Sequence, residues 1–295
     1  MISRWTPLNK MTYFGFLLRF LIIPILVFLA ITYWDNRRNR QITSFQTGRA
    51  VWIGIGIHIL LAVFYTTLWD NYLVATGVWY YNPKLVTGLV IGYVPIEEYT
   101  FFVLETLLSG LWWWFLVLRL PARLDYAGIP LNTINRNEFK PSKLPVYLST
   151  CLLALLWLLF TYLFFFGEAQ WTYLSIILFW ALPPIFVQLL FGADILWRYR
   201  KLVFWAIVAP ATYLSVMDII ALKETTWSIS TSQTMGILFF GILPLEEVVF
   251  FFVTNMLITF GMTLLLADIS QKRFAEIRKQ VQGWKEKYSL DPQSR

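Results

Sequence analysis

The sequence predicts an all-α integral membrane protein with seven transmembrane helices, built from two parallel three-helix repeats joined by a linking helix. Of its 295 residues, 58% are hydrophobic and only 14% are charged. A soluble domain of this length cannot bury so much apolar surface. Long apolar stretches recur along the chain, and one short motif occurs twice at matching positions. These three observations together predict the fold class.

The apolar stretches have the length of membrane spans. A helix needs roughly 20 apolar residues to cross the hydrocarbon core of a bilayer. No stretch has the short alternation of polar and apolar residues that is typical of barrel strands, so we expect helices throughout. The predicted spans are about 11–34, 50–69, 87–118, 144–166, 171–191, 202–222 and 233–267.

The positions of Lys and Arg predict the orientation. Most of the 24 basic residues follow the first, third, fifth and last spans. Cytoplasmic segments carry such an excess, so we expect the N-terminus outside and the C-terminus in the cytoplasm, in a bacterial inner membrane. This bias accounts for the net charge of +7 without a nucleic-acid partner. Arg19 lies within the first span, and we expect its guanidinium to extend to the outer interface.

The two ends of the chain carry further predictions. The first apolar run continues to about Trp34 without a small-residue cleavage site, which indicates a retained span instead of a cleaved signal. Apolar residues of the tail recur at three- and four-residue steps and predict an amphipathic helix on the cytoplasmic membrane surface, with a soluble helix as the alternative. These tail residues are Phe274, Ile277, Val281, Trp284 and Tyr288.

One motif occurs twice in the chain. "PIEEYTFF" at 95–102 matches "PLEEVVFF" at 244–251. Upstream of each copy an Asp precedes a Trp by nine positions, Asp70 before Trp79 and Asp218 before Trp227. A matched series of this length predicts two repeats. The expected units are residues 1–120 for the first repeat, 121–170 for a loop and the linking helix, 171–267 for the second repeat, and 268–295 for the tail.

The two repeats are expected to be parallel. A single linking helix between two three-helix units makes both enter the membrane from the same side, so they are related by an axis near the membrane normal. Both Glu pairs of the motif then lie near the same leaflet. We therefore expect them to converge on one central site.

Each motif places two glutamates directly behind a proline and ahead of apolar residues. Proline is tolerated in the first turn of a helix and breaks a helix interior, so we expect a kink or a new helix start there. The carboxyl groups then lie below the outer interface, where an ionised carboxylate is costly. We expect burial and like charge to outweigh the helix dipole, leaving at least one neutral carboxylic acid that can donate a proton. The candidate catalytic residues are Glu97, Glu98, Glu246 and Glu247.

Glu105 is a further candidate acid. It lies seven positions after Glu98, on the same helix face and about 10 Å along the axis. The second copy has Thr254 at the matching position, so only the first copy carries this acid. A catalytic role and a buried, hydrogen-bonded structural role both remain open for Glu105.

Aromatic residues surround both Glu pairs. A Phe pair lies three and four positions past the second glutamate of each motif. Aromatic faces stabilise a cation without offering a nucleophile that would trap it, whereas lipid-facing packing is the alternative for most single aromatics. A neutral acid beside aromatic walls suits acid-catalysed chemistry on a hydrocarbon through a carbocation. The candidate substrate-binding residues are Phe101, Phe102, Phe250, Phe251, Trp79 and Trp227.

Several classes of site are not expected. The one cysteine, Cys151, and the one histidine, His58, both lie in apolar runs, so no metal centre is predicted. The Gly-x-Gly at 54–56 has no third glycine and no strand before it, which argues against a dinucleotide site. The last span has no lysine for a retinal Schiff base. No cofactor is therefore expected.

The repeated motif, with its upstream Asp and its "GVW" or "TTW" turn, resembles the heterodimer-type lycopene cyclase domain family of carotenoid biosynthesis, here with both halves in one chain. The resemblance covers about residues 11–120 and 171–267. It implies cofactor-independent, acid-catalysed cyclisation of the ψ end groups of a linear carotene, from lycopene to γ-carotene and β-carotene. The four motif glutamates would supply the acid and the base and exchange these roles.

The resemblance leaves two points open in the site. Asp70 and Asp218 either hold and recharge the acids or cap helix ends. The second copy has "TTW" at 225–227 where the first has "GVW", and it lacks Glu105, so the two halves need not be equivalent. If one half does more of the chemistry, we expect it to be the first.

Two other functions suit the same features. A cyclase of longer, prenylated carotenoids would share the fold and motif, and parallel repeats with intramembrane acids also suit a proton-coupled transporter of a hydrophobic or small molecule. A transporter needs a polar path to both surfaces, whereas cytoplasmic halves such as "LWWWFLVL" are almost free of polar side chains. This favours a cyclase whose substrate is a carotenoid held in the lipid bilayer. Other carotenoid enzymes or a second copy of the chain are the candidate protein partners.

Overall fold

The computed structural model describes residues 10–38, 45–120 and 143–289, where it is mostly helical. Within these residues, six helical segments are long and apolar enough to cross a membrane. The first, Tyr13–Arg37, consists of α1 (Tyr13–Leu17), one π-helical turn (Leu18–Ile22) and α2 (Ile23–Arg37). The other five are α3 (Arg49–Ala75), α4 (Ile96–Arg119), α6 (Thr172–Arg198), α7 (Arg200–Glu224) and α8 (Leu245–Leu266).

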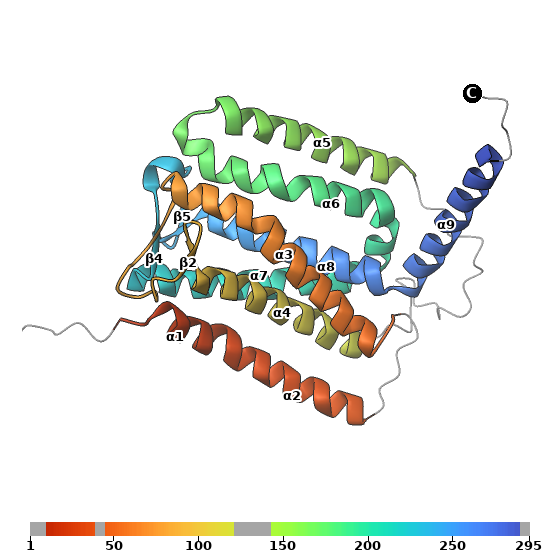
Figure 1. Ribbon diagram of the computed structural model, residues 1–295, viewed down its shortest axis with the longest axis horizontal. Helices are drawn as coiled ribbons and strands as arrows, with labels where there is room; N and C mark the ends of the chain where they lie inside the picture. The colour runs from red at the N-terminus through yellow and green to blue at the C-terminus, as the bar shows by residue number, and fades with distance from the viewer. Residues whose placement is uncertain (1–9, 39–44, 121–142, 290–295) are drawn as a thin grey trace, which may run out of the picture.

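Helix α5 (Lys143–Phe166) covers the predicted linking span and lies beside α6 (Figure 1). Its described apolar part, Thr150–Phe166, is shorter than the six long helices. The predicted loop before it, residues 121–142, lies outside the described residues.

Two predicted spans, 87–118 and 233–267, are wrong at their N-terminal ends. The helices begin at Ile96 and Leu245, each directly after a proline in extended conformation, so the proline starts a new helix as one of the two expected outcomes. The residue before a proline is disfavoured in helical conformation, which keeps the preceding segment out of the helix. In both copies that segment folds back as a short hairpin instead.

The described residues contain six short strands that the prediction of an all-α chain missed. β2 (Val90–Ile91) pairs with β3 (Val94–Pro95), and β5 (Leu238–Phe239) pairs with β6 (Leu243–Pro244), both antiparallel. β1 (Trp79–Tyr81) pairs antiparallel with β4 (Trp227–Ile229) and so joins the two copies of the motif. The turns of the two hairpins contain Gly92 and Gly241 at φ of 67° and 69°, where a glycine is favoured.

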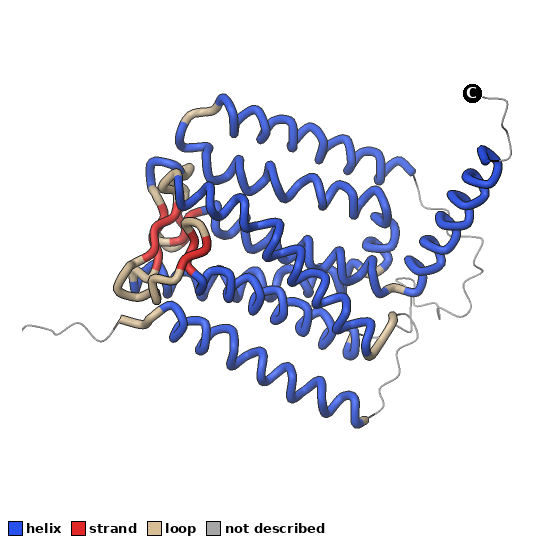
Figure 2. The backbone as a smooth tube through the Cα atoms, in the orientation of Figure 1, coloured by secondary structure: helices blue, strands red, loops and turns tan. Residues whose placement is uncertain are grey.

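The strands gather at one end of the helix bundle (Figure 2). Helices α4, α6 and α8 begin at this end, and α3 and α7 end there (Figure 1). The backbone N–H groups of Ile96 and Leu245 donate at 2.9 Å to the carbonyls of Leu89 and Ile237, the residues directly before the two hairpins. The hairpins therefore fix the first turns of α4 and α8, which carry the two Glu pairs.

Helices α4 and α8 form the centre of the bundle. In the most apolar part of α4, 67% of the residues are buried, and in α8 the share is 56%, against 22% in α3. The remaining helices surround these two and expose apolar side chains such as Leu60, Phe64 and Leu190. Exposed apolar side chains of this kind are expected where a helix faces lipid.

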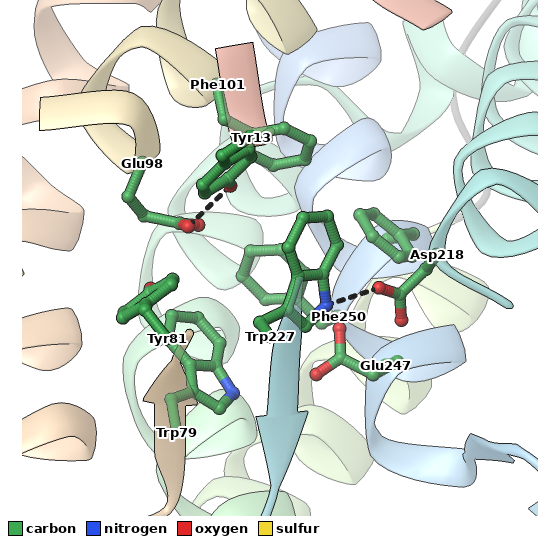
Figure 3. A pocket seen from close by; sticks show the side chains of 10 residues that line it. Tyr13, Trp79, Tyr81, Glu98, Phe101, Asp218, Trp227, Glu247 and Phe250 are labelled. Atoms are coloured by element: carbon green, nitrogen blue, oxygen red, sulfur yellow. Dashed lines mark hydrogen bonds between the residues drawn. The ribbon is translucent and has the colours of Figure 1, made fainter. Parts of the chain in front are cut away.

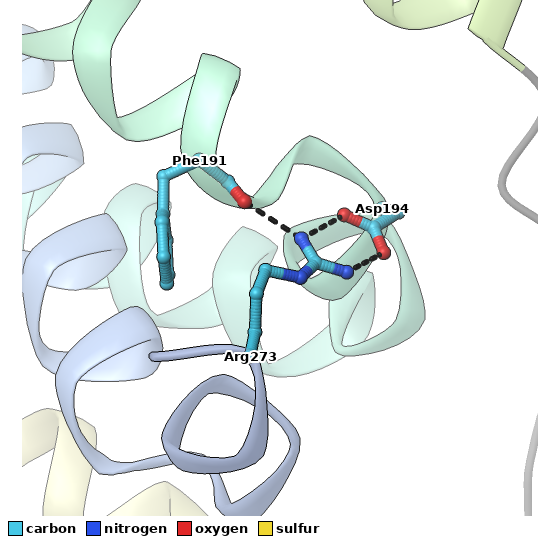
Figure 4. A network of polar contacts seen from close by, with 3 residues as sticks. All are labelled: Phe191, Asp194 and Arg273. Carbon is cyan, nitrogen blue, oxygen red and sulfur yellow. Dashed lines mark hydrogen bonds and ion pairs between the residues drawn. The ribbon is translucent and has the colours of Figure 1, made fainter. Parts of the chain in front are cut away.

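The predicted tail helix forms as α9 (Asp268–Ser289), which projects from the bundle (Figure 1). Its base is attached to α6, because Arg273 forms an ion pair with Asp194 at 2.5 Å and donates to the carbonyl of Phe191 (Figure 4). The ring of Phe274 stacks on Phe191 with centroids 4.4 Å apart. The side chains of residues 284–289 and the whole of 290–295 lie outside the described part of the chain.

Candidate active site

Glu98 and Glu247 line one small pocket at the strand end of the bundle (Figure 3). We call it the carboxylate pocket. Its volume of about 30 Å³ is enough for a water molecule, so a larger ligand needs side chains to move. The pocket is lined by Tyr13, Trp79, Tyr81, Glu98, Phe101, Asp218, Trp227, Glu247, Phe250 and Phe251.

The two glutamates of each motif point in different directions. Consecutive helical residues lie 100° apart, so only one of them can face the pocket. Glu97 Oε1 accepts a hydrogen bond from the backbone N–H of Thr87 at 2.6 Å, and Glu246 Oε1 accepts one from Met235 at the same distance. Both side chains are fully buried, and neither lines the carboxylate pocket. The structure thus brings Glu98 and Glu247 together, whereas the other two glutamates are hydrogen-bonded to the loops that precede the hairpins.

Each pocket glutamate has a tyrosine partner. The hydroxyl of Tyr13 donates to Glu98 Oε2 at 2.6 Å, and the hydroxyl of Tyr173 donates to Glu247 Oε1 at 2.6 Å. Both tyrosines are almost completely buried. Among the described residues no Lys or Arg lines the pocket, so neutral hydroxyl donors, not cations, bind these carboxyl groups.

The two Asp residues at matching positions of the repeat are not equivalent in the structure. Asp218 lines the carboxylate pocket, and its Oδ1 accepts from the indole N–H of Trp227 at 2.7 Å (Figure 3). Asp70 is buried but does not line this pocket. Both lie inside helices, α3 and α7, and neither is an N-cap, so the capping alternative does not apply to them.

Aromatic rings form most of the pocket wall. Trp79 lies edge-on to Phe250, with ring centroids 6.2 Å apart, and Phe101 lies 6.4 Å from Phe251. The Trp227 ring is 4.9 Å from that of Tyr13. Five of the six predicted substrate-binding aromatics therefore line the carboxylate pocket, and the sixth is Phe102, which lines a different cavity.

Known proteins of one family are similar to this chain. The lycopene beta-cyclase of Halobacterium salinarum is 36% identical over 231 residues, which are 78% of this chain and 85% of that protein. The chain belongs to the lycopene cyclase family. This confirms the family that the repeated motif predicts.

Fungal relatives match over a similar stretch of this chain. The bifunctional lycopene cyclase/phytoene synthase of Podospora anserina is 33% identical over 225 residues, 73% of this chain and 35% of that protein. The protein of the same name in Aspergillus oryzae is 29% identical over 246 residues, 82% of this chain and 38% of that protein. No protein-family model and no solved structure match the chain.

Glu105 lies apart from the carboxylate pocket. It lines a larger cavity of about 460 Å³, is 3% exposed, and accepts a hydrogen bond from the hydroxyl of Thr254 at 3.1 Å. Thr254 is the residue that occupies the matching position in the second copy. In the structure Glu105 is thus buried and hydrogen-bonded, and it does not line the pocket of Glu98 and Glu247.

Sequence reasoning missed three tyrosines of the site. Tyr13 and Tyr173 each follow a threonine and precede a proline by eleven positions, a second repeated pattern that was available in the sequence. Tyr81 lies on β1 and lines the pocket beside Glu98 (Figure 3). Burial, and then the charge of Glu98, raise the pKa of Tyr81 well above its usual value. Tyr81 is therefore a neutral hydroxyl that can donate a hydrogen bond.

Proposed function

We propose that the chain cyclises the ψ end groups of lycopene, to γ-carotene and then β-carotene, by proton transfer from and to Glu98 and Glu247. The observation that carries the proposal is that one buried glutamate from each copy of the motif lines a single aromatic-walled pocket. Family membership supplies the substrate class, since the relatives are named lycopene cyclases.

In the proposed reaction one of the two glutamates begins as a neutral acid and the other as a carboxylate. The acid transfers its proton to the terminal double bond, which forms a C–H bond and leaves a tertiary carbocation. A neighbouring double bond attacks the cation and closes the ring, and the ring then loses a proton to the carboxylate. One proton is taken up and one is released, so the product is an isomer and no redox cofactor takes part.

The pocket walls are suited to a short-lived cation. The faces of Trp79, Phe101 and Phe250 offer electron density without a nucleophilic atom. The hydroxyl groups of Tyr13 and Tyr173 stabilise the carboxylate that remains when a proton has been donated, because a hydrogen bond to an ionised acceptor is stronger than one to a neutral acceptor.

We assign different roles to the remaining acids. Glu97 and Glu246 act as positioning residues that hold the hairpin loops on the first turns of α4 and α8. Asp218 acts on Glu247 inside the pocket, whereas Asp70 supports the site from outside it. Glu105 belongs to the neighbouring cavity and takes no direct part in proton transfer.

We propose that the chain forms seven spans, counting α5, with two parallel repeats bounded as the sequence predicts, 1–120 and 171–267. Reciprocal contacts support the repeats. Tyr65 donates to the carbonyl of Trp180 at 2.8 Å, and Tyr213, at the matching position, donates to the carbonyl of Phe20 at 2.7 Å. Contacts of this paired kind are expected on either side of a twofold axis.

The proposed location is a bacterial inner membrane, with the strand end and the carboxylate pocket near the outer leaflet. The excess of Lys and Arg near the opposite end of the helices supports this orientation. Helix α9 then lies on the cytoplasmic surface, with the exposed side chains of Phe274, Ile277 and Val281 toward the lipid.

Expression in a bacterial host that accumulates lycopene tests the function. The wild-type chain is expected to change the pigment from red to orange or yellow, with γ-carotene and β-carotene identified by chromatography. Glu98→Gln and Glu247→Gln should each remain in the membrane and lose about 100-fold or more of the rate, which is the usual contribution of a general acid or base. Unaltered lycopene beside correctly inserted wild-type protein would contradict the function, and full activity of both variants would remove the two glutamates from the mechanism.

A further inference from the structure

A large cavity adjoins the carboxylate pocket between α3, α4, α6 and α8. We call it the lateral cleft. Its volume of about 460 Å³ is in the range of sites that hold a small organic ligand, and most of its lining is apolar. Phe250 lines both the lateral cleft and the carboxylate pocket, so the two cavities share this side chain.

The outer side of the lateral cleft faces the surface where lipid is expected. Leu61 of α3 and Val187 of α6 line the cleft and are 60% and 63% exposed. They belong to two of the helices that are long and apolar enough to cross a membrane. The cleft therefore connects a lipid-facing surface with the aromatic wall of the carboxylate pocket.

Three polar side chains of the lateral cleft are bonded to the protein, and the buried Oε1 atom of Gln188 is left without a hydrogen-bond partner among the described residues. Glu105 accepts from Thr254, the Nε2 group of Gln188 donates to the carbonyl of Leu257 at 3.0 Å, and His58 Nδ1 forms a hydrogen bond with the carbonyl of Gly54 at 2.7 Å. A ligand in the cleft thus meets mainly apolar and aromatic surface. This chemistry suits a hydrocarbon.

A second cleft lies between α2, α4 and α7, at positions that match the lateral cleft in the other repeat, but it is smaller, about 250 Å³. Several residues occupy matching positions in the two clefts. They are Pro24 and Pro184, Tyr213 and Tyr65, and Leu108 and Leu257.

Two matched positions differ strongly in size. The smaller cleft has Phe28 and Trp112, whose rings pack edge-on with centroids 5.8 Å apart. The other repeat has Gln188 and Gly261 at these positions, and the His58 ring takes the place that a side chain on Gly261 would need. Aromatic rings therefore narrow one cleft to about 250 Å³, and the other keeps about 460 Å³.

We propose that the lateral cleft binds the linear polyene arm of the substrate while one end group turns past Phe250 into the carboxylate pocket. This inference rests on the proposed function. The 30 Å³ pocket cannot hold a carotene, whereas the adjoining cleft offers an apolar channel that a long hydrocarbon can enter from the bilayer. Because only the larger cleft adjoins the carboxylate pocket through a shared side chain, the two ends of lycopene react one after the other, and the singly cyclised product leaves and returns in reverse orientation.

The test blocks the cleft in a protein that binds but does not react. In the Glu98→Gln/Glu247→Gln double variant, purified in detergent, added lycopene is expected to bind in a protein environment that shifts its absorption bands. Val187→Trp in this background should weaken the binding at least tenfold, and Leu61→Trp is a second blocking variant. Leu190→Trp is the matched control, since Leu190 lies on the same helix, is 53% exposed and does not line the cleft.

A control in the other repeat tests the asymmetry. Ala209→Trp adds the same ring to the smaller cleft and should leave the binding unchanged. In the active protein, γ-carotene should appear before β-carotene, and Val187→Trp should slow both steps. Unchanged binding in Val187→Trp and Leu61→Trp, both shown to be folded by their melting temperatures, would overturn the inference, as would an equal loss in Ala209→Trp. If the wild-type chain still cyclises lycopene in either case, the lateral cleft is not the binding site of the polyene arm, and the proposed cyclase function stands.

Discussion

Replacing Tyr173 by phenylalanine removes the hydroxyl that donates to Glu247 at 2.6 Å and changes little else, because the ring remains. A hydrogen bond between neutral groups stabilises by about 1 kcal/mol, and one to an ionised group by about 1.5–3 kcal/mol. The hydroxyl therefore favours the ionised form of Glu247 by about 0.5–2 kcal/mol. If Glu247 ionises as it protonates the substrate, this difference raises the barrier and slows cyclisation by about 2- to 30-fold.

The rate should be measured with purified protein and lycopene, beside melting temperatures in detergent. Tyr80→Phe is the matched control, since Tyr80 is 54% exposed and does not line the pocket. We expect a lower rate for Tyr173→Phe at unchanged substrate affinity, and no change for Tyr80→Phe. Full activity of Tyr173→Phe would refute the role of this hydroxyl, and an equal loss in both variants would show that the effect does not come from the pocket.

Two further predictions concern the strand end of the bundle. Glu97→Gln and Glu246→Gln keep an oxygen that accepts from the backbone of Thr87 and Met235. Each variant should lose about 1 kcal/mol of stability and retain most of the activity, in contrast to glutamine at the two pocket positions. Melting curves and product yields check both results. Thr225 adopts φ of 57° where the first copy has a glycine. Thr225→Gly should therefore increase the free energy of unfolding by up to about 1 kcal/mol, raise the melting temperature and leave the product unchanged.

Hydropathy predicted the membrane spans well and the strand end poorly. Residues 87–94 and 233–243 are as apolar as the spans they precede, and a composition window cannot distinguish a hairpin from a helix. The prolines marked the true helix starts, and Gly92 and Gly241 marked the tight turns. Giving these residues more weight than the length of the apolar run would have predicted both hairpins.

The site was predictable in kind but not in detail. The cost of burying a carboxyl group identified the Glu pairs, yet which glutamate of each pair faces the pocket depends on how the first helical turn is rotated. Tertiary packing sets that rotation, which local sequence patterns do not predict. Tyr13 and Tyr173 were missed because a tyrosine near the end of a span is typical of the membrane interface, although the matching patterns around them were a usable signal.

The surroundings of the two pocket glutamates divide the roles of acid and base between them. Glu98 accepts from Tyr13 and has Tyr81 beside it, and Glu247 accepts from Tyr173. Glu247 also shares its side of the pocket with Asp218, whose Oδ1 accepts from the indole of Trp227 (Figure 3). A negative charge on Asp218 favours the neutral form of Glu247. We therefore expect Glu247 to keep its proton and act as the acid.

The variant Asp218→Asn tests this division. It keeps an oxygen acceptor for the indole of Trp227 and removes the neighbouring negative charge, so Glu247 loses its proton more readily. Cyclisation should then be slower at neutral pH and recover when the pH is lowered. Asp70→Asn, at the matching position outside the pocket, should leave the pH profile unchanged. If Asp218→Asn lowers the rate equally at every pH, its carboxylate does not control the proton on Glu247, and the acid must be sought in Glu98.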